Sequence, residues 1–324
     1  MVYVFKEPKE FIEPFYQTSI RPFPCEVELL ESKAFRRLKF LSHYGTGSLI
    51  TSAKHTRFEH TIGVWAIVST FFPKEEELRI AALLHDIGHL PFSHAVERTL
   101  GFNHHTITEE NIRGQEISTI LNKYGYDPNR IIEILDNDSP LSHKTPYLSA
   151  DHLDSFLRDA YMLGKIKEHP ATIFKNLSFN HQYVEANLDT SKHIIGAIYE
   201  DHRTFLKPIS LALDSMLAKA ISIFASEKEV DLQSIQSLTN NELLQLLQNA
   251  NIEAVNKILS IILWYPEKVS IHEEDTVGAV GVEVKKVYDK TPLVNGTPLT
   301  EICSDTQETL EAIRAMKKMY YYSY

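Results

Sequence analysis

The sequence predicts a mainly α-helical fold with a smaller β component. Apolar residues recur chiefly at helical spacing, and capping or turn residues bound most of these periodic segments. Alternation typical of strands is confined to short segments after position 165. We therefore expect a helical core over residues 1–165, and over 166–324 a mostly helical region with short strands that packs on this core.

Four helices are expected in the first region. Their ends follow from stop signals, namely Gly45, Pro73 and Gly164. The third helix opens with three glutamates, which suit the positive end of a helix dipole and need no other explanation. The expected helical segments are 26–45, 57–73, 74–89 and 149–164.

The second region combines helices with short strands. The segment 173–188 alternates around an Asn-His turn and predicts a hairpin, and the helical stretch 191–226 contains Pro208, which should kink or split it. Residues 277–296 are typical of strand and turn. Two capping-box patterns predict further helices near 240 and 305: Thr239 with Glu242, and Ser304 with Gln307.

Composition limits the classes of partner. The formal net charge is −10, from 33 basic against 43 acidic side chains, so we expect no general attraction to nucleic acid or to an anionic membrane. Cys25 and Cys303 lack CxxC spacing, which argues against a thiolate zinc cluster and favours a reducing compartment. We see neither a signal peptide nor an apolar run of about 18 residues, and expect a cytoplasmic protein with no membrane span. Amphipathic helices after position 165 predict a homo-oligomer contact.

The segment "LLHDIGHLPFSH", residues 83–94, crowds three histidines and an aspartate at the end of an apolar run. Adjacent helical residues project about 100° apart, so His85 and Asp86 can share an ion only near a helix end, which Gly88 and Pro91 provide. A bound cation makes such polar groups tolerable beside a core. We therefore expect one divalent metal site with four ligands from three helices: His60, His85, Asp86 and Asp151. These donors accept manganese, iron, nickel, cobalt or zinc, with magnesium also a candidate, so the ion's identity stays open.

A second group of residues suits proton transfer and anion binding. His94 and Glu97 stand at i and i+3, where a carboxylate raises the basicity of an imidazole, and His104 and His105 supply further imidazoles. "KHTRFEH" places Lys54, His55 and Arg57 near His60, and a guanidinium there can neutralise a phosphate.

Simpler interpretations stand beside these. A single histidine is more often a hydrogen-bonded core or surface residue than a ligand, so the case depends on the whole set. For Glu97 the alternative is a solvated helix face. Arg57 has Glu59 or Glu109 as alternative ion-pair partners.

The motifs resemble the HD-domain metal-dependent phosphohydrolases, and within them the deoxynucleoside triphosphate triphosphohydrolase (dGTPase-like) branch. The resemblance covers roughly half of the chain, through "AFRRLKFLSHYG", "RFEHTIGV", "HDIGHLPFSH" and "ADHLDSFLRDA". It implies an HD-domain catalytic core within 1–165 and the same four metal ligands. It also implies phosphate-contacting and proton-transfer roles for Arg57, His89, His94, Glu97 and His104, with Glu97 standing where an aspartate is common.

The substrate-binding positions depart from that branch. Where it presents Gln-Leu-Gly after the first helix, this chain has His43, Tyr44 and Gly45; a tyrosine under the sugar is replaced by Ser155, and a lysine after the metal-binding aspartate by His152. We expect these residues, together with Lys54, to line an altered substrate site.

The resemblance implies attack of an activated water on phosphorus, with His94 or His104 protonating the leaving oxygen. The sequence thus predicts a phosphohydrolase for a nucleotide, a dNTP among the candidates, or for another small phosphorylated compound. Two alternatives remain: a phosphodiesterase or phosphomonoesterase on a different substrate, and a non-catalytic metal-binding regulatory module. The proton-transfer residues argue against the latter, since a structural ion needs none.

Overall fold

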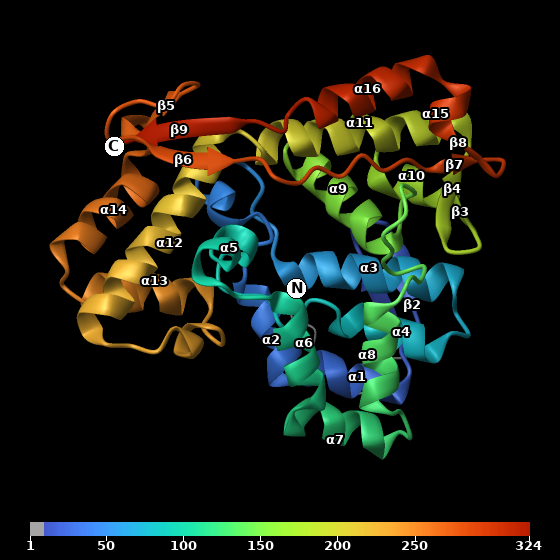
Figure 1. The fold of residues 1–324 in the computed structure, drawn as a ribbon. Helices are drawn as coiled ribbons and strands as arrows, with labels where there is room; N and C mark the ends of the chain where they lie inside the picture. The colour runs from blue at the N-terminus through green and yellow to red at the C-terminus, as the bar shows by residue number, and fades with distance from the viewer. Residues whose placement is uncertain (1–9) are drawn as a thin grey trace.

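The computed structural model describes residues 10–324, and over this range the chain is mainly α-helical with small sheets, as expected (Figure 1). The segment expected as one helix over 26–45 is broken, and that prediction was wrong. Ser32 adopts an extended conformation, and its hydroxyl accepts a hydrogen bond from the N–H of Phe35, which starts a new helix. The pieces are α1 (Pro24–Glu31), α2 (Lys33–Arg37), η1 (Leu38–Phe40) and η2 (Gly45–Leu49).

The other helices of the first region follow the sequence more closely. α3 ends just before Pro73, and the third helix is shorter than expected because the backbone leaves the helix at His85. Five short helical elements, η3 and α5 to α8, link it to α9. The elements are α3 (Arg57–Phe71), α4 (Glu76–Leu84), η3 (Ser93–Ala95), α5 (Glu97–Leu100), α6 (His104–Arg113), α7 (Gln115–Lys123), α8 (Pro128–Asp136) and α9 (Ala150–Met162).

In the second region the long helical stretch splits at Pro208, which occupies the first turn of α12, as predicted. The Thr239–Glu242 capping box opens α13 as expected, whereas Cys303 rather than Ser304 takes the N-cap position of α16. The elements are α10 (Pro170–Lys175), α11 (Leu188–Phe205), α12 (Pro208–Lys228), η4 (Leu232–Ile235), α13 (Asn240–Asn249), α14 (Glu253–Trp264), η5 (Pro266–Lys268), α15 (Leu299–Ile302) and α16 (Ser304–Arg314).

The strands form small sheets. The expected hairpin is present, with β3 and β4 antiparallel and His181 in the turn at φ 55°. β4 also pairs in parallel with β7, and β9 pairs antiparallel with both β5 and β6. The sheets are β1 (Phe11–Glu13) with β2 (Thr18–Ile20); β3 (Leu177–Asn180), β4 (Tyr183–Ala186), β7 (Leu293–Val294) and β8 (Thr297–Pro298); and β5 (Ser270–His272), β9 (Met319–Ser323) and β6 (Val280–Glu283).

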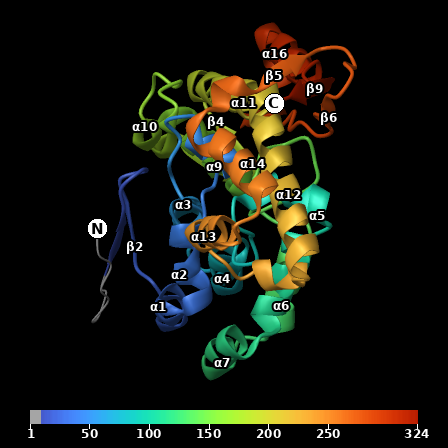
Figure 2. The ribbon, with the colours of Figure 1, turned by 90° about the vertical axis from the view of Figure 1, so that its left-hand side faces the viewer.

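Two hydrophobic clusters position the site. The first includes Trp65 of α3 and draws on α4, α9 and α11, so residues on both sides of position 165 pack together. The second gathers α12, α13 and α14, which Figures 1 and 2 show side by side, around Leu90 and Phe92. The turn after α4 is therefore held by the second cluster, while α3 and α4 belong to the first. The domain boundary at 165 stays a prediction.

The sequence was expected to contain no segment that could span a membrane, but helix α12 passes the test of length and composition. Within residues 10–324 it is the one helix long and apolar enough to do so by length and composition. However, 56% of its most apolar window is buried, and it packs against α14 in the second cluster. A core helix passes the same test, so this is weak evidence for a span.

Candidate active site

The four predicted metal ligands converge. Nε2 of His60 on α3 lies 3.1 Å from Oδ1 of Asp151 on α9 and 3.4 Å from Nε2 of His85 at the end of α4. Oδ1 of Asp86 lies 3.5 Å from Nε2 of His85, and Oδ2 lies 3.8 Å from Nε2 of His60. Ligands about 2.1 Å from one ion lie roughly 3.0 to 3.5 Å apart in octahedral or tetrahedral geometry. Three of these four distances fall in that range and the fourth, from His60 to Asp86, is 3.8 Å, so the four residues lie close enough to share one divalent ion.

The end of α4 lets neighbouring residues face one point. The chain leaves the helix at His85 and turns so that the N–H of His89 donates to the carbonyl of Asp86 at 3.0 Å. A Cβ on Gly88 would collide with the backbone N of Thr108 and lie 2.5 Å from the carbonyl O of His104. Glycine is thus required for α6 to approach this turn, as the expected helix end implied.

Hydrogen bonds orient both ligand imidazoles. Nδ1 of His60 lies 2.9 Å from Oδ2 of Asp154, and Nδ1 of His85 lies 2.9 Å from the carbonyl O of Ala82. Because a carboxylate or carbonyl oxygen can only accept, each Nδ1 donates, and each Nε2 faces the shared point. This is the arrangement that metal-binding histidines require.

The charges around His60 favour a cation. Burial lowers its pKa, but hydrogen bonds to Asp151 and Asp154 outweigh burial and raise that pKa to about 9. Burial raises the pKa of Asp154, but Arg158 and His60 hold it at about 2. Two ionised carboxylates therefore surround one imidazole.

Arg57 supports the metal ligand Asp86. Its Nη1 lies 2.9 Å from Oδ2 of Asp86, and its Nε donates to Oγ of Ser93 at 2.9 Å. The alternative partners are excluded, because Glu59 caps α3 and Glu109 pairs with Arg113. Burial raises the pKa of Asp86, but Arg57 and the neighbouring imidazoles hold it well below its usual range.

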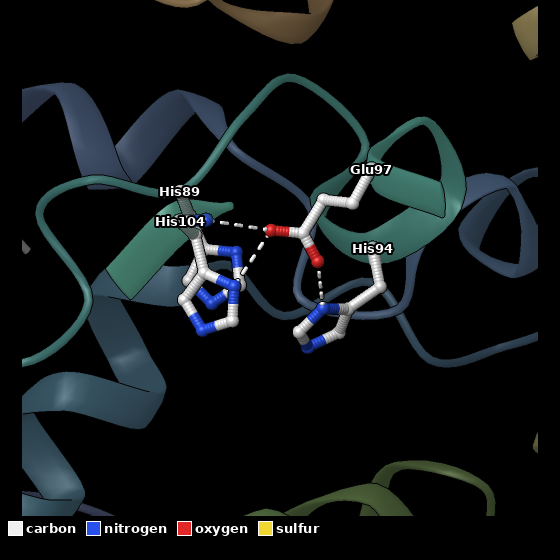
Figure 3. A group of neighbouring side chains, drawn as sticks. All are labelled: His89, His94, Glu97 and His104. Carbon is white, nitrogen blue, oxygen red and sulfur yellow. Dashed lines mark hydrogen bonds and ion pairs between the residues drawn. The ribbon is translucent and has the colours of Figure 1, made fainter. Parts of the chain in front are cut away.

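Figure 3 shows the predicted proton-transfer group, in which Glu97 points between two imidazoles. Its Oε2 accepts from Nδ1 of His94 at 2.5 Å, and its Oε1 accepts from Nδ1 of His104 at 2.6 Å and from the same residue's N–H at 3.0 Å. Burial raises the pKa of Glu97, but these hydrogen bonds outweigh burial and lower it. The solvated-face interpretation of Glu97 is wrong, since its side chain is 11% exposed, against 59% for that of His94.

His89 links this group to the metal ligands. Its ring stacks on His104 with centroids 4.0 Å apart, and its Nε2 lies 3.3 Å from Oδ1 of Asp86. Burial and the nearby Arg57 hold the pKa of His89 well below its usual range, so its imidazole is neutral. Arg57 and His89 therefore contact the predicted ligand Asp86 directly, and His104, Glu97 and His94 are connected to it through His89.

The predicted substrate-binding residues are only partly brought together. Nε2 of His43 lies 3.1 Å from Oγ of Ser155, beside the metal ligands. Burial lowers the pKa of His152 to about 4 despite the adjacent Asp151, so this residue carries no charge near neutral pH. Tyr44 is 2% exposed, with its ring against Phe205. Lys54 is exposed, and among residues 10–324 no hydrogen bond or ion pair joins it to the other predicted site residues.

Sequence reasoning missed Asp154, which orients His60. It lies one turn after Asp151 on α9, so the two carboxylates share a helix face, and this spacing was the available signal. It also missed Arg158, whose Nη2 lies 2.9 Å from Oδ1 of Asp154.

Comparisons with known proteins agree with this geometry. The family model described as HD domain matches residues 57–153. The protein YdhJ of Bacillus subtilis (strain 168) is 30% identical over 246 residues, which are 72% of this chain and 74% of YdhJ. Three further relatives, from an archaeon and two mycoplasmas, are covered over 51% to 54% of their length.

Two other relatives are named for an activity. The metal-dependent phosphohydrolase cns2 of Cordyceps militaris is 34% identical over 150 residues, 44% of this chain and 42% of cns2. The deoxynucleoside triphosphate triphosphohydrolase SAMHD1 homolog of Dictyostelium discoideum is 35% identical over 86 residues, 22% of this chain and 17% of the homolog.

Solved structures share the fold across almost the whole chain. A phosphohydrolase from Bacteroides thetaiotaomicron superposes with a TM-score of 0.74 at 18% identity, covering 98% of this chain and 99% of that one. A hypothetical protein from Aquifex aeolicus gives a TM-score of 0.73 at 23% identity, covering 97% and 95%. At such identities the likeness concerns the fold alone.

Proposed function

The chain belongs to the HD-domain family of metal-dependent phosphohydrolases, and on this premise we propose that it hydrolyses a nucleotide, with a deoxynucleoside triphosphate as the first candidate. A divalent metal is the expected cofactor, and its identity is open. The observation that carries the proposal is the proximity of His85, Asp86 and Asp151 to His60, with the His94–Glu97–His104 group joined to Asp86 through His89.

The chain's own residues supply binding and proton transfer. A divalent ion, when bound, lowers the pKa of water and offsets charge that develops on phosphorus. Glu97 accepts from Nδ1 of both His94 and His104, so the Nε2 atom of either ring is the one left to give a proton to a leaving oxygen. His94 is the better placed donor, because its side chain is the more exposed. Arg57 holds Asp86 and adds positive charge beside the site.

The substrate proposal rests on the site's charge. The net charge of the chain is negative, so an anionic substrate must meet the local cation and Arg57. The similarity to the SAMHD1 homolog supports a deoxynucleoside triphosphate, and the neutral His152 favours a substrate with fewer phosphates. A phosphodiester or phosphomonoester is therefore the second candidate, favoured by that observation.

A substrate panel tests the proposal. The full chain, stripped and reloaded with manganese, cobalt or nickel, is incubated with deoxynucleoside triphosphates, ribonucleotides, cyclic nucleotides and sugar phosphates. Chromatography then identifies phosphate, pyrophosphate or triphosphate as product. We expect at least one nucleotide to be hydrolysed by the wild type and not by Asp86→Ala. Release of product by neither protein, or equally by both, would refute the proposed function.

We also propose a location and an assembly for the chain. The free cysteines Cys25 and Cys303 fit a reducing cytoplasm. Homo-oligomer formation stays a prediction from the amphipathic helices after position 165, and a monomer in light scattering would contradict it.

A further inference from the structure

We propose that a second divalent cation binds beside the first, between His43, His55 and Asp159. These three residues, called the second metal site below, come from three places in the chain. His43 precedes η2, His55 precedes α3, and Asp159 lies on α9, eight positions after the metal ligand Asp151. The proposal concerns an additional ion and does not depend on which substrate the enzyme hydrolyses.

Backbone hydrogen bonds bring the residues of the second metal site together. The N–H of His43 donates to the carbonyl of His55 at 3.2 Å, and Ser42 forms a bridge with Thr56, so the loop from 41 to 57 returns upon itself. This brings the two imidazole rings within 5.0 Å between centroids. α9 then presents Asp159 to both rings.

The donor atoms have the spacing of metal ligands. Nε2 of His55 lies 3.1 Å from Oδ1 of Asp159, and Nε2 of His43 lies 3.7 Å from Oδ2 of Asp159. One ligand atom from each of the three residues lies within 4.8 Å of the others. Two nitrogens and a carboxylate oxygen at these distances are a donor set that first-row divalent metals accept.

The second metal site is buried, and several imidazole nitrogens in it lack hydrogen bonds. His43, His55 and Asp159 are 7%, 2% and 0% exposed. Within residues 10–324, both nitrogens of His55 and Nδ1 of His43 have no hydrogen-bond partner, and the carboxylate of Asp159 interacts with His43, His55 and the carboxyl group of Asp201. Each such atom costs free energy unless something satisfies it, and a cation would satisfy several together.

A second carboxyl adds to the need for positive charge. Asp201 on α11 is 7% exposed, and its carboxyl group lies beside that of Asp159. Among the described residues, the ion pairs of Asp159 are with His43 and His55, and no lysine or arginine pairs with it. A divalent ion would relieve two adjacent carboxyl groups that no guanidinium or ammonium reaches.

His43 connects the two centres. Its ring lies 4.5 Å from the ring of His60 between centroids, and its ligand atom also lies within 4.8 Å of those of His60 and Asp86. The first ion has four donors without His43, so this residue is available to the second. Paired ions that stabilise both the attacking and the leaving oxygen are a known device for phosphoryl hydrolysis.

Metal stoichiometry tests the proposal without reference to activity. The full chain is stripped, reloaded with excess Mn²⁺, passed through gel filtration and measured by plasma mass spectrometry. We expect about two ions per wild-type chain and about one in both His55→Gln and Asp159→Asn. His181→Gln, an exposed histidine in the β3–β4 turn, is the matched control and should keep both ions. Electron paramagnetic resonance of the loaded wild type should show coupling between neighbouring Mn²⁺ ions that His55→Gln and Asp159→Asn both lose.

The controls separate the possible outcomes. Circular dichroism checks that each variant is folded. If His55→Gln does not fold, the isosteric variant Asp159→Asn decides the outcome. One ion per wild-type chain, or two ions in folded Asp159→Asn, would overturn the proposal. Glu97→Gln should keep both ions, and loss of an ion there would assign the second site to the His89, His94, Glu97 and His104 group instead. Because these experiments measure bound metal and not nucleotide hydrolysis, a result against the second ion would not contradict the proposed function.

Discussion

Asp154, fully buried on α9, accepts a hydrogen bond from Nδ1 of His60 at 2.9 Å, although the two residues are 94 positions apart. Arg158 lies one turn further along α9 and donates from Nε to the same oxygen at 3.0 Å. Arg158 thereby holds the carboxylate of Asp154 in place, and this carboxylate in turn orients the imidazole of His60. The tautomer and direction of a metal ligand thus depend on a residue that does not touch the metal position.

The first prediction concerns this carboxylate. Asp154→Asn removes the negative charge that fixes the His60 imidazole, so metal affinity should fall about 10- to 100-fold. Titration against a fluorescent chelator measures it. Glu13→Gln, which changes the other carboxylate near Arg158, serves as the control and should change affinity little. Unaltered affinity in Asp154→Asn would show that the carboxylate does not orient His60.

The second prediction concerns Gly63 of α3. A Cβ at this position would collide with Oδ1 of Asp154 and Nη2 of Arg158, so Gly63→Ala should push the ion pair away from His60. We expect destabilisation of about 1 to 3 kcal/mol, from overpacking, together with weaker metal binding. Urea unfolding with and without metal measures both. Gly196→Ala, where a Cβ meets open space on α11, should leave the stability nearly unchanged or raise it.

The third prediction is a pH dependence. Glu97 has a pKa below its unfolded value, so the unfolded chain binds more protons in acid and the contribution of Glu97 to stability is lost as pH falls. At pH 6 the free energy of unfolding should be larger for the wild type than for Glu97→Gln. This difference between the two proteins should decrease between about pH 5 and pH 3. A difference that stays constant with pH would exclude an ionised Glu97.

The same substitution tests proton transfer. Glu97→Gln leaves an acceptor for only one imidazole N–H and removes the carboxylate charge. Turnover of whichever nucleotide the wild type hydrolyses should fall by about 100-fold or more, while metal content is retained. Full turnover in a metal-loaded variant would place the proton donor elsewhere.

The fourth prediction is that the ion stabilises the fold. A ligand at about 1,000 times its dissociation constant adds roughly 4 kcal/mol, so chelation should lower the melting temperature by several degrees. Asp151→Asn should show a smaller shift, since it removes one donor of the first ion. Equal shifts in the two proteins would indicate that the stabilising ion binds elsewhere.

The four candidate ligands of the first ion could be selected from the sequence because their signals are local. The HD doublet lies beside an apolar run, Gly88 and Pro91 end the helix within a few residues, and Asp151 stands in the first turn of a capped helix. α3 and α9 were predicted nearly to their ends for the same reason. In contrast, the apolar stripe over 26–45 continues through Ser32, so periodicity alone did not show the break.

Features that depend on tertiary contacts could not be predicted. Asp154 acts on a histidine 94 positions away, and nothing in its own neighbourhood indicates which partner it has. Arg57 was expected to contact phosphate, with Glu59 or Glu109 as alternative ion-pair partners, whereas the fold places its guanidinium on Asp86. The strands β1 and β2 have three residues each, too few for alternation to show. His55 and Asp159 meet only because a loop returns beside α9.

The central claim is that three helical segments bring His60, His85, Asp86 and Asp151 around one divalent ion. Anomalous diffraction at the manganese edge, from crystals of the full chain grown with Mn²⁺, tests it most directly. We predict a peak about 2.0 to 2.3 Å from Nε2 of both histidines and from a carboxylate oxygen of both aspartates. The absence of any peak there in manganese-loaded crystals, or His60 and Asp151 turned away from the 85/86 pair, would contradict the account.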